Sequence, residues 1–597
     1  MYQRLRDTFV SLLRETLQDF DGLREWVNSQ GTLIYICALV IGIVVGYAAW
    51  GFRLALAEVQ HLFYGERDER LVSVLLDLPW WHLLAAPTIG GLLVALFVKY
   101  FMPGGRPQGV PDVIEAGIYT EGHMSLRAGL GAAFVNILSL GAGASTGREG
   151  PLVHLGGSLS GFISKKLDLD RSAGHTMLAC GVASGVAASF NAPIAGVIFA
   201  HEVVLGHFAL RALAPVVLSA VMGTIVTRVH IGDFPAFLIP QYDILSFWQF
   251  PAFMLLGILC GLIALIFFWS VSFSTGVFQR LPVSKFWRVP LAGFLVGGIA
   301  LLFPEVIGVG YEATDNALKQ EYTFILLVAL VAAKMAATSI SVAGGFGGGV
   351  FSPSLFLGAM TGGAFGIVAA GIFPELAAEH GLYAIVGMGA VASAVLGAPL
   401  STLLIVFELT GDYRVTILLM VSVVLSNAIA KHFRYRNIFH WQLENREVRV
   451  VDIDQVLLHG ERVGDVMDRD FECIADTMPI SEMRVYYRDH DAKAFYVVDA
   501  NDRLIGEVGL VDAKHALLDP EMNDDCCCAR DLLSDPGGML TPEMPLDEAR
   551  ERFSNALRKH LPVVSDPHDP HLIGVLHYRD LVEAHNRALE SAKEEMR

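Results

Sequence analysis

Long stretches without charge are the feature that most restricts the fold of this chain. Residues 244–279 and 335–374 contain no charged side chain, and 53% of all residues are hydrophobic. Residues 31–52 and 78–98 form further apolar stretches that are long enough to cross a bilayer. Because no water reaches the hydrocarbon to satisfy exposed backbone groups, such segments have to fold as helices. The sequence therefore predicts an all-α polytopic membrane protein and not a soluble enzyme.

Glycine and proline interrupt many of these stretches, and they do so at matching places in two halves of the chain. Residues 181–202 contain the turn at Pro193 and end at Glu202, whereas residues 387–408 contain the turn at Pro399 and end at Glu408, with a constant offset of 206 residues. Broken helices at membrane depth are tolerated only where they are buried or line a cavity. Matching breaks in two halves indicate inverted repeats with a binding site between them near the midplane.

Glu149 stands out in the first half. Within residues 128–164 the ionisable side chains are Arg148, Glu149 and His154. A carboxylate at bilayer depth is costly and indicates a functional site. The segment 147–151, GREGP, permits a sharp bend followed by a helix start, whose unpaired N–H groups and positive dipole end favour an anion. We therefore expect an inorganic anion and the Glu149 carboxylate to compete for one place.

Further glycine-rich segments direct helix starts toward the same point. They are residues 104–111, residues 344–353 and the polar exit near Asn437. Backbone N–H groups bind an anion without a full positive charge, which would hold the ion too tightly for fast passage. Arg148 is accordingly expected to brace its loop or shape the field more than to bind the ion directly.

Three of these segments, GREGP, GGVFSP and the GVP of the first loop, resemble the signature segments of the CLC chloride channels and transporters, in order and spacing over about residues 30–440. The resemblance implies a CLC-type bundle of broken and tilted helices, and a homodimer with one anion pathway in each subunit. It implies that Glu149 is the gating glutamate, which plugs the outer anion site when charged and swings away when protonated. The residues assigned to the anion pathway are Gln108, Gly109, Val110, Arg148, Gly150, Val350, Phe351 and Phe439.

Two positions depart from the pattern of the family. Where the family usually places a serine that coordinates the central anion, this chain has Gln108, whose larger amide donates but also accepts hydrogen bonds. Where the family places a coordinating tyrosine, this chain has Phe439, which cannot donate a hydrogen bond. We therefore expect a weaker or relocated central anion site.

A third departure concerns protons. Proton-coupled members often carry two consecutive glutamates on the inner side, and Val203 occupies the position of the second one. Because valine cannot relay a proton, the sequence favours a passive channel gated by voltage and pH through Glu149. The alternative is a chloride/proton antiporter with a nonstandard inner proton path through His201 or Glu202. Glu202 is interpreted mainly as a structural carboxylate, because Glu408 occupies the equivalent place in the other half.

The C-terminal part of the chain has a different composition. From Glu444 onward there are 34 acidic and 18 basic residues, so this segment holds 16 of the 18 net negative charges and argues against nucleic acid as a partner. After a linker (441–458), residues 459–597 resemble a tandem pair of cytoplasmic α/β CBS domains. By that resemblance Asp512 and Asp580 bind the ribose of an adenine nucleotide. Gly509 and His577 replace the expected hydroxyl residues, so a structural dimerisation module and a nucleotide sensor both stay open.

The remaining expectations concern placement and chemistry. Residues 1–30 are predicted to form a membrane-surface helix on the cytoplasmic side. We expect an integral protein of a bacterial inner (plasma) membrane, with both termini cytoplasmic. The membrane domain is expected to span residues 31–440, with repeats at about 31–230 and 244–433. The sequence shows no nucleophile–base or metal constellation, and the cysteines at 526–528 lack zinc-site spacing, so we expect neither an enzyme nor a required cofactor or metal. The expected partners are chloride or other small anions, protons and the lipid bilayer.

Overall fold

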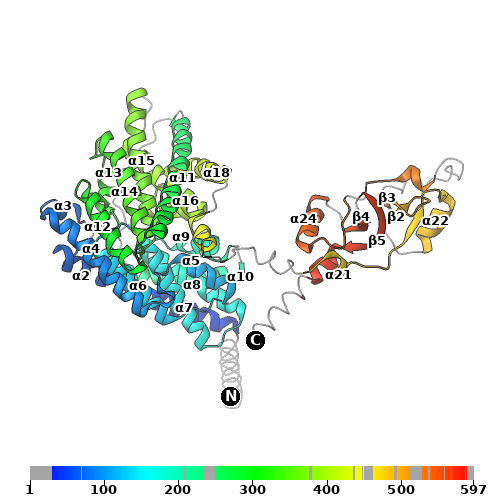
Figure 1. Cartoon of the computed structure of the whole chain (residues 1–597), viewed down its shortest axis with the longest axis horizontal. Coiled ribbons are helices and arrows are strands. Elements are labelled where there is room, and N and C mark those ends of the chain that lie inside the picture. Colours follow the sequence, from blue (N-terminus) through cyan, green and yellow to red (C-terminus); the bar gives the residue numbers. More distant parts are fainter. Residues whose placement is uncertain are drawn as a thin grey trace, which may run out of the picture. The chain divides into compact units, whose positions relative to one another are not determined.

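The computed structural model describes residues 30–68, 70–120, 122–206, 210–232, 249–374, 379–433, 437–446, 448, 461–489, 494–509, 528–535, 538–556, 559–566, 568–584 and 587. The chain divides into two compact units, Met1–Val450 and Val451–Arg597, whose elements are labelled in Figure 1. The predicted surface helix at residues 1–30 lies almost entirely outside the described residues.

The first unit is helical. Its first half consists of α2 (Gln30–Tyr64), α3 (Val72–Leu75), α4 (Trp80–Phe101), the 3-10 turn η1 (Pro103–Gly105), α5 (Val110–Tyr119), α6 (Leu126–Gly141), α7 (Glu149–Lys166), α8 (Arg171–Phe190), α9 (Pro193–Phe199), the π-helical turn η2 (Ala200–Leu205) and α10 (Leu210–Ile231). The second half consists of α11 (Phe250–Arg280), α12 (Lys285–Ala300), the 3-10 turn η4 (Pro304–Val306), α13 (Tyr311–Leu318), α14 (Phe324–Gly344), α15 (Phe351–Ile372), α16 (His380–Leu396), α17 (Pro399–Thr410) and α18 (Tyr413–His432), followed by α19 (Ile438–Glu444). Eight helices of the described residues are long and apolar enough to cross a membrane, as predicted for a polytopic bundle.

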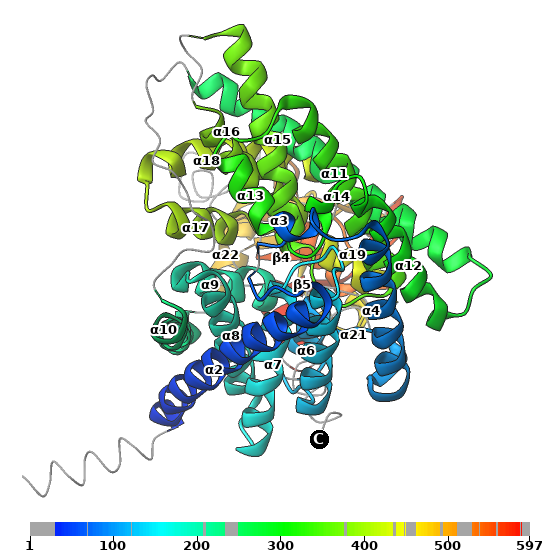
Figure 2. The ribbon, with the colours of Figure 1, turned by 90° about the vertical axis from the view of Figure 1, so that its left-hand side faces the viewer.

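The second half repeats the packing of the first. Helix α7 packs on α8 as α15 packs on α16, and α2 packs on α10 as α11 packs on α18. Figure 2 shows the half from α2 to α10, in blue and cyan, beside the half from α11 to α18, in green and yellow. The loops before α7 and α15 meet directly: Gly147 N–H donates to the Gly349 carbonyl at 2.7 Å, and Gly349 N–H donates to the Gly147 carbonyl at 2.8 Å. The two glycine-rich loops that the sequence placed far apart thus form one contact.

Small residues allow the helices of each half to approach closely. A Cβ atom at Gly362 of α15 would overlap the carbonyl oxygen of Tyr383 in α16, and one at Gly156 of α7 would overlap the carbonyl oxygen of Gly181 in α8. Interfaces between membrane helices are enriched in small residues for this reason. The high glycine content, 59 residues in the chain, therefore serves helix packing as well as helix breaks.

Each half also caps a helix of the other half. The Glu408 carboxylate, in the last turn of α17, accepts hydrogen bonds from the N–H groups of Ile194 (3.0 Å) and Ala195 (2.8 Å) at the start of α9. The Glu202 carboxylate, in η2, accepts them from Leu400 (3.1 Å) and Ser401 (2.8 Å) at the start of α17. A carboxylate there satisfies orphan N–H groups and complements the positive end of the helix dipole. This geometry is the one expected of structural carboxylates.

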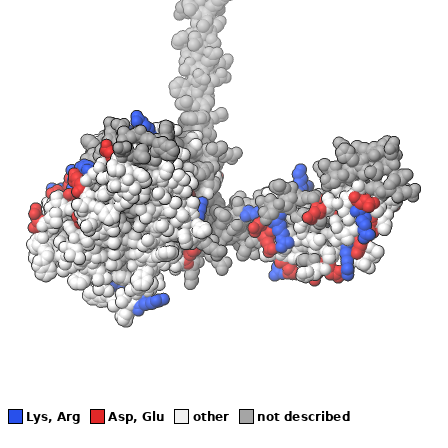
Figure 3. Space-filling view, turned by 90° about the horizontal axis from the view of Figure 1, so that it is seen from above, with Lys and Arg blue, Asp and Glu red and all other residues white. Residues whose placement is uncertain are grey.

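The second unit contains two small sheets. Strands β1 (Cys473–Ala475), β2 (Ala494–Val498) and β3 (Leu504–Gly509) form one sheet in the order β1-β2-β3, with β1 parallel and β3 antiparallel to β2. Strands β4 (His560–Asp566) and β5 (Asp569–His577) form an antiparallel pair. Among the described residues of this unit, the other elements are α21 (Val463–Val466), α22 (Ile480–Asp489), η5 (Ala529–Leu532) and α24 (Leu546–Ala556). In Figure 3 both signs of charge are spread over this unit, whereas the visible described face of the membrane unit is mostly uncharged.

Candidate functional site

Glu149 is the first residue of α7 and is almost completely buried, with 2% of its surface exposed. Both oxygens of its carboxylate accept hydrogen bonds from hydroxyl groups of the second half. The Tyr311 hydroxyl at the start of α13 donates to Oε1 at 2.9 Å, and the Ser352 hydroxyl in the first turn of α15 donates to Oε2. Hydrogen bonds to an ionised acceptor are among the stronger ones. The structure therefore holds the carboxylate between two helix starts.

Arg148 lies beside this carboxylate but faces the ring of Tyr311. Its guanidinium carbon is 4.7 Å from the ring centroid, and the side chain is 1% exposed. A guanidinium over an aromatic face is attracted by the ring quadrupole. Arg148 thus packs against the residue that donates to Glu149.

The loop before Tyr311 is fixed by a buried lysine. Lys334 of α14 is fully buried and donates to the carbonyl oxygens of Val306 (3.1 Å) and Gly308 (2.9 Å). Gly310 precedes α13 with φ of 90°, a left-handed conformation that favours glycine. These contacts determine where the Tyr311 hydroxyl lies.

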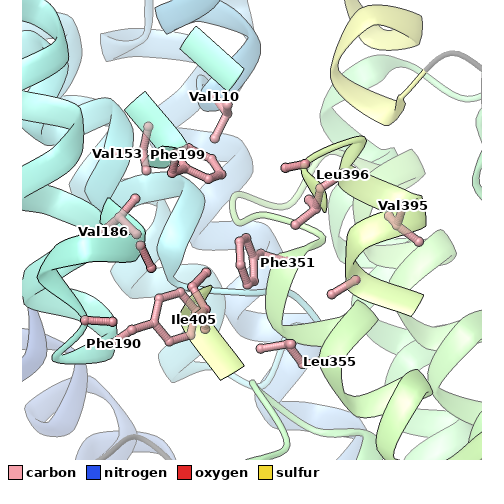
Figure 4. Packing of buried hydrophobic residues seen from close by; sticks show 14 of the residues in the cluster. Val110, Val153, Val186, Phe190, Phe199, Phe351, Leu355, Val395, Leu396 and Ile405 are labelled. Atoms are coloured by element: carbon pink, nitrogen blue, oxygen red, sulfur yellow. The ribbon is translucent and has the colours of Figure 1, made fainter. Parts of the chain in front are cut away.

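A narrow cavity adjoins the Glu149 carboxylate. Its volume is about 10 Å³, room for a particle the size of one water molecule. The lining residues are Val110, Glu149, Gly150, Val153, Val186, Phe199, Gly349, Val350, Phe351 and Phe439. Apart from Glu149 these residues have apolar side chains or none. In Figure 4, Phe351 lies between Val153, Val186 and Phe199 of the first half and Leu396 of the second.

Six residues assigned to the gate and anion pathway from the sequence meet at this cavity: Glu149, Val110, Gly150, Val350, Phe351 and Phe439. Gln108, Gly109 and Arg148 are not among its lining residues. Gly109 instead donates its N–H to the Asp112 carboxylate at 2.8 Å, which caps the start of α5. The loop with Gln108 therefore contributes Val110 to the cavity and no side-chain hydrogen-bond donor.

Sequence reasoning missed Asp112, Tyr311 and Ser352. Asp112 also binds Arg106 (2.6 Å) and Arg446 (3.3 Å), so it joins the first loop to the segment that follows α19. Its position three residues after Gly109, at a helix start, is a capping signal that could have identified it. Ser352 lies within the GGVFSP segment, but Tyr311 is 162 residues from Glu149 and carries no local signal.

The candidate inner proton groups lie in the π-helical turn η2. His201 is buried, Glu202 caps α17, and Val203 is half-buried and packs against the apolar core. Single π-helical turns inside helices often mark functional sites. None of these three residues lines the cavity at Glu149.

In the second unit one of the two nucleotide candidates is described. Asp580 lies next to Arg579, with 3.6 Å between carboxylate and guanidinium, whereas Asp512 lies outside the described residues. Gly509 ends β3 and His577 ends β5. Cys528 is the last residue of the cysteine run. Its N–H donates to the Asp531 carboxylate at 2.9 Å, which lowers the pKa of that carboxyl group.

Comparison with known proteins gives consistent matches over both units. The family model for "Voltage gated chloride channel" matches residues 90–431, and the CBS domain model matches residues 463–519 and 529–587. A "Putative chloride channel protein ClcB-like" of Ralstonia nicotianae is 34% identical over 390 residues, covering 64% of this chain and 90% of that protein. An "H(+)/Cl(-) exchange transporter ClcA" of Vibrio cholerae is 30% identical over 478 residues, covering 75% of this chain and 98% of that protein.

Two solved structures share the fold. The crystal structure of a slow cyanobacterial Cl⁻/H⁺ antiporter superposes with a TM-score of 0.63 at 25% identity, covering 70% of this chain and 98% of that chain. A eukaryotic CLC transporter superposes with a TM-score of 0.62, covering 92% of this chain and 99% of that chain, and at 18% identity it supports the fold alone.

Proposed function

This chain belongs to the voltage-gated chloride channel family, with tandem CBS domains, and transports anions across a membrane; on this premise we propose that it exchanges chloride for protons. The observation that carries the proposal is the position of Glu149. An ionisable carboxylate fills the end of an otherwise apolar cavity, at a helix start that favours anions. Charged, it occupies the place of an anion; protonated, it no longer competes for that place.

In the proposed exchange, protons and anions are coupled at Glu149. Entry of an anion requires the carboxylate to leave, and leaving the two hydroxyl donors is easier for a neutral acid than for a carboxylate. Each cycle therefore takes up a proton at Glu149 and releases it when the carboxylate returns. The similarity to the exchange transporter ClcA over 98% of its length supports exchange over passive flow, as does the superposition on an antiporter at 25% identity.

The second candidate is the passive, voltage- and pH-gated channel that the sequence favours. Val203 supports it, because a valine at the inner position offers no proton acceptor. The similarity to the chloride channel protein ClcB-like supports it as well. Under exchange, the inner proton group has to be another residue, and His201 of the π-helical turn is our candidate because its neighbour Glu202 is engaged as a helix cap.

We further propose the homodimer, the bacterial inner membrane and the cytoplasmic termini that the family resemblance implies. For the second unit we propose two alternatives: it is a structural dimerisation module, or it is a sensor that binds an adenine nucleotide.

The test is the reversal potential of the purified protein in liposomes under a chloride gradient, with and without an opposing pH gradient. Exchange predicts a value displaced from the chloride Nernst potential that follows the pH gradient. In the control Glu149→Ala, which lacks the proton-carrying group, the value should return to the chloride Nernst potential. A wild-type value at that potential, indifferent to pH, would establish the channel instead.

A further inference from the structure

We propose that Ser352 and Tyr311 are the side-chain hydroxyl ligands of the transported anion in this protein. They act at the place that the Glu149 carboxylate fills in this structure, so the inference rests on the proposed function and deepens it. Gln108 and Phe439 stand where the family usually has the two hydroxyl residues that coordinate the anion. In this chain the hydroxyl ligands therefore lie at the gate and not in the inner part of the pathway. The ligand class is a small inorganic anion such as chloride.

The carboxylate of Glu149 serves as a stand-in for the anion. Its two oxygens mark where a negative charge is held, and the hydroxyls of Tyr311 and Ser352 point at them. A chloride ion in the same place needs donors from the same directions, because an anion and a carboxylate oxygen both accept hydrogen bonds. The contacts of the closed gate therefore identify donors for the open one.

The inner part of the pathway offers an apolar surface in contrast. Val110, Phe199, Phe351 and Phe439 line the cavity next to Glu149, and Gln108 does not reach it. An anion in this cavity gains backbone dipoles but no side-chain hydrogen bond. The strongest side-chain ligation on the pathway accordingly lies at the gate.

Both hydroxyls are held in place by contacts that do not involve Glu149. Tyr311 is buried under the Arg148 guanidinium, on a loop whose carbonyls accept hydrogen bonds from Lys334. Ser352 is buried in the first turn of α15, where Pro353 fits the helix start. Donors that are fixed before the ligand arrives lose little freedom on binding.

Departure of the carboxylate would remove the acceptor of the buried Ser352 hydroxyl. A buried hydroxyl without an acceptor is costly, so the vacated place favours entry of another acceptor. The charged group next to it is the Arg148 guanidinium, a cation, which makes an anion the favoured occupant. Ser352 and Tyr311 thus stabilise the plug and its replacement in turn.

The decisive experiment measures chloride binding in a Glu149→Ala background, where the plug is absent. Isothermal titration calorimetry on the purified full chain should give a chloride Kd about tenfold to a hundredfold weaker for Glu149→Ala/Ser352→Ala than for Glu149→Ala, as expected for one lost hydrogen bond to a charged group. Glu149→Ala/Tyr311→Phe should show a loss of the same order.

The matched control is Ser354→Ala in the same background. Ser354 lies in the same turn of α15 and is equally buried, but its hydroxyl donates to the Phe351 carbonyl. Its removal should leave chloride affinity within about twofold. Melting temperatures of all variants check that the fold is kept. If Ser352→Ala is destabilised, Ser352→Thr is measured in its place: it keeps the hydroxyl, so its chloride affinity should stay close to that of Glu149→Ala.

Equal chloride affinity in Glu149→Ala and its Ser352→Ala and Tyr311→Phe derivatives would overturn the inference and leave both hydroxyls as holders of the carboxylate only. That result would not affect exchange, which is judged from the wild-type reversal potential. A wild-type protein that proves to be a passive channel would refute exchange while the affinity losses still established the two anion ligands.

Discussion

The two halves of the membrane unit share a frame and differ in chemistry. Glu149 begins α7 and Phe351 begins α15, each two residues after one of the paired glycines Gly147 and Gly349. At these equivalent positions the first half supplies an acid and the second half an apolar ring. The next residue is Gly150 in one half and Ser352, a donor to that acid, in the other. An approximately symmetric scaffold therefore carries an asymmetric site.

Residues that support the shared scaffold can thus be distinguished from residues that are candidates for function. Glu202 and Glu408 are equivalent and do the same thing, since each caps the broken helix of the opposite half. Positions where the halves agree are explained by packing and by the hydrogen-bonding needs of helix ends. Positions where they differ are the candidates for function.

Removing the charge that distinguishes the halves should have the largest effect. Glu149→Gln keeps the size of the side chain but cannot change its charge, so chloride efflux from liposomes should lose its response to external pH. Phe351→Leu, at the equivalent position of the second half, should alter the rate but keep that response. An unchanged pH profile in Glu149→Gln would contradict the gating role.

The second largest effect is expected at His201, an ionisable residue whose equivalent in the other half, Phe407, has an aromatic ring. His201 precedes Glu202 as Phe407 precedes Glu408. His201→Phe makes the halves alike and removes the candidate inner proton group, so the reversal potential should move toward the chloride Nernst value. His201→Gln tests whether the loss follows the titratable group and not ring size. A reversal potential equal to that of the wild type would direct the search for the proton path elsewhere.

Substitution of either capping carboxylate should destabilise the protein to a similar degree. Glu202→Gln and Glu408→Gln each weaken the hydrogen bonds to two helical N–H groups, with an expected cost of about 1 kcal/mol, typical of a lost helix cap. Thermal unfolding in detergent should show comparable decreases in Tm for the two variants. If Glu202→Gln alone also shifts the reversal potential, Glu202 serves proton transfer in addition to capping.

The smallest effect is expected at the inner end of the cavity, outside both repeats. Phe439→Tyr adds a hydroxyl next to an apolar surface, and chloride affinity should rise by about threefold, the lower range for one hydrogen bond. Calorimetry on Glu149→Ala/Phe439→Tyr against Glu149→Ala measures it. No gain in affinity would mean that the anion does not dwell beside Phe439.

Local patterns were enough for the class of fold and for the central residue. Charge-free stretches predict membrane helices, and a carboxylate in apolar surroundings, Glu149, predicts a site, because both conclusions depend on the cost of polar groups in hydrocarbon. Gln108 stays a prediction: its place in the first loop suggests an amide donor on the pathway, whereas the cavity at Glu149 is lined by Val110 of the same loop. A loop sequence does not determine which of its side chains turns inward.

The amino-acid sequence was sufficient to predict a membrane bundle of two related halves with broken helices, a candidate site at Glu149 and a separate acidic tail. The groups that hold the Glu149 carboxylate could be identified from the three-dimensional structure but not from the sequence. Tyr311 and Ser352 lie 162 and 203 residues from Glu149, and each meets it because helices with small residues pack closely enough to bring the starts of α7, α13 and α15 together. Such contacts depend on packing across the whole bundle, and periodicity and composition report only on neighbours along the chain.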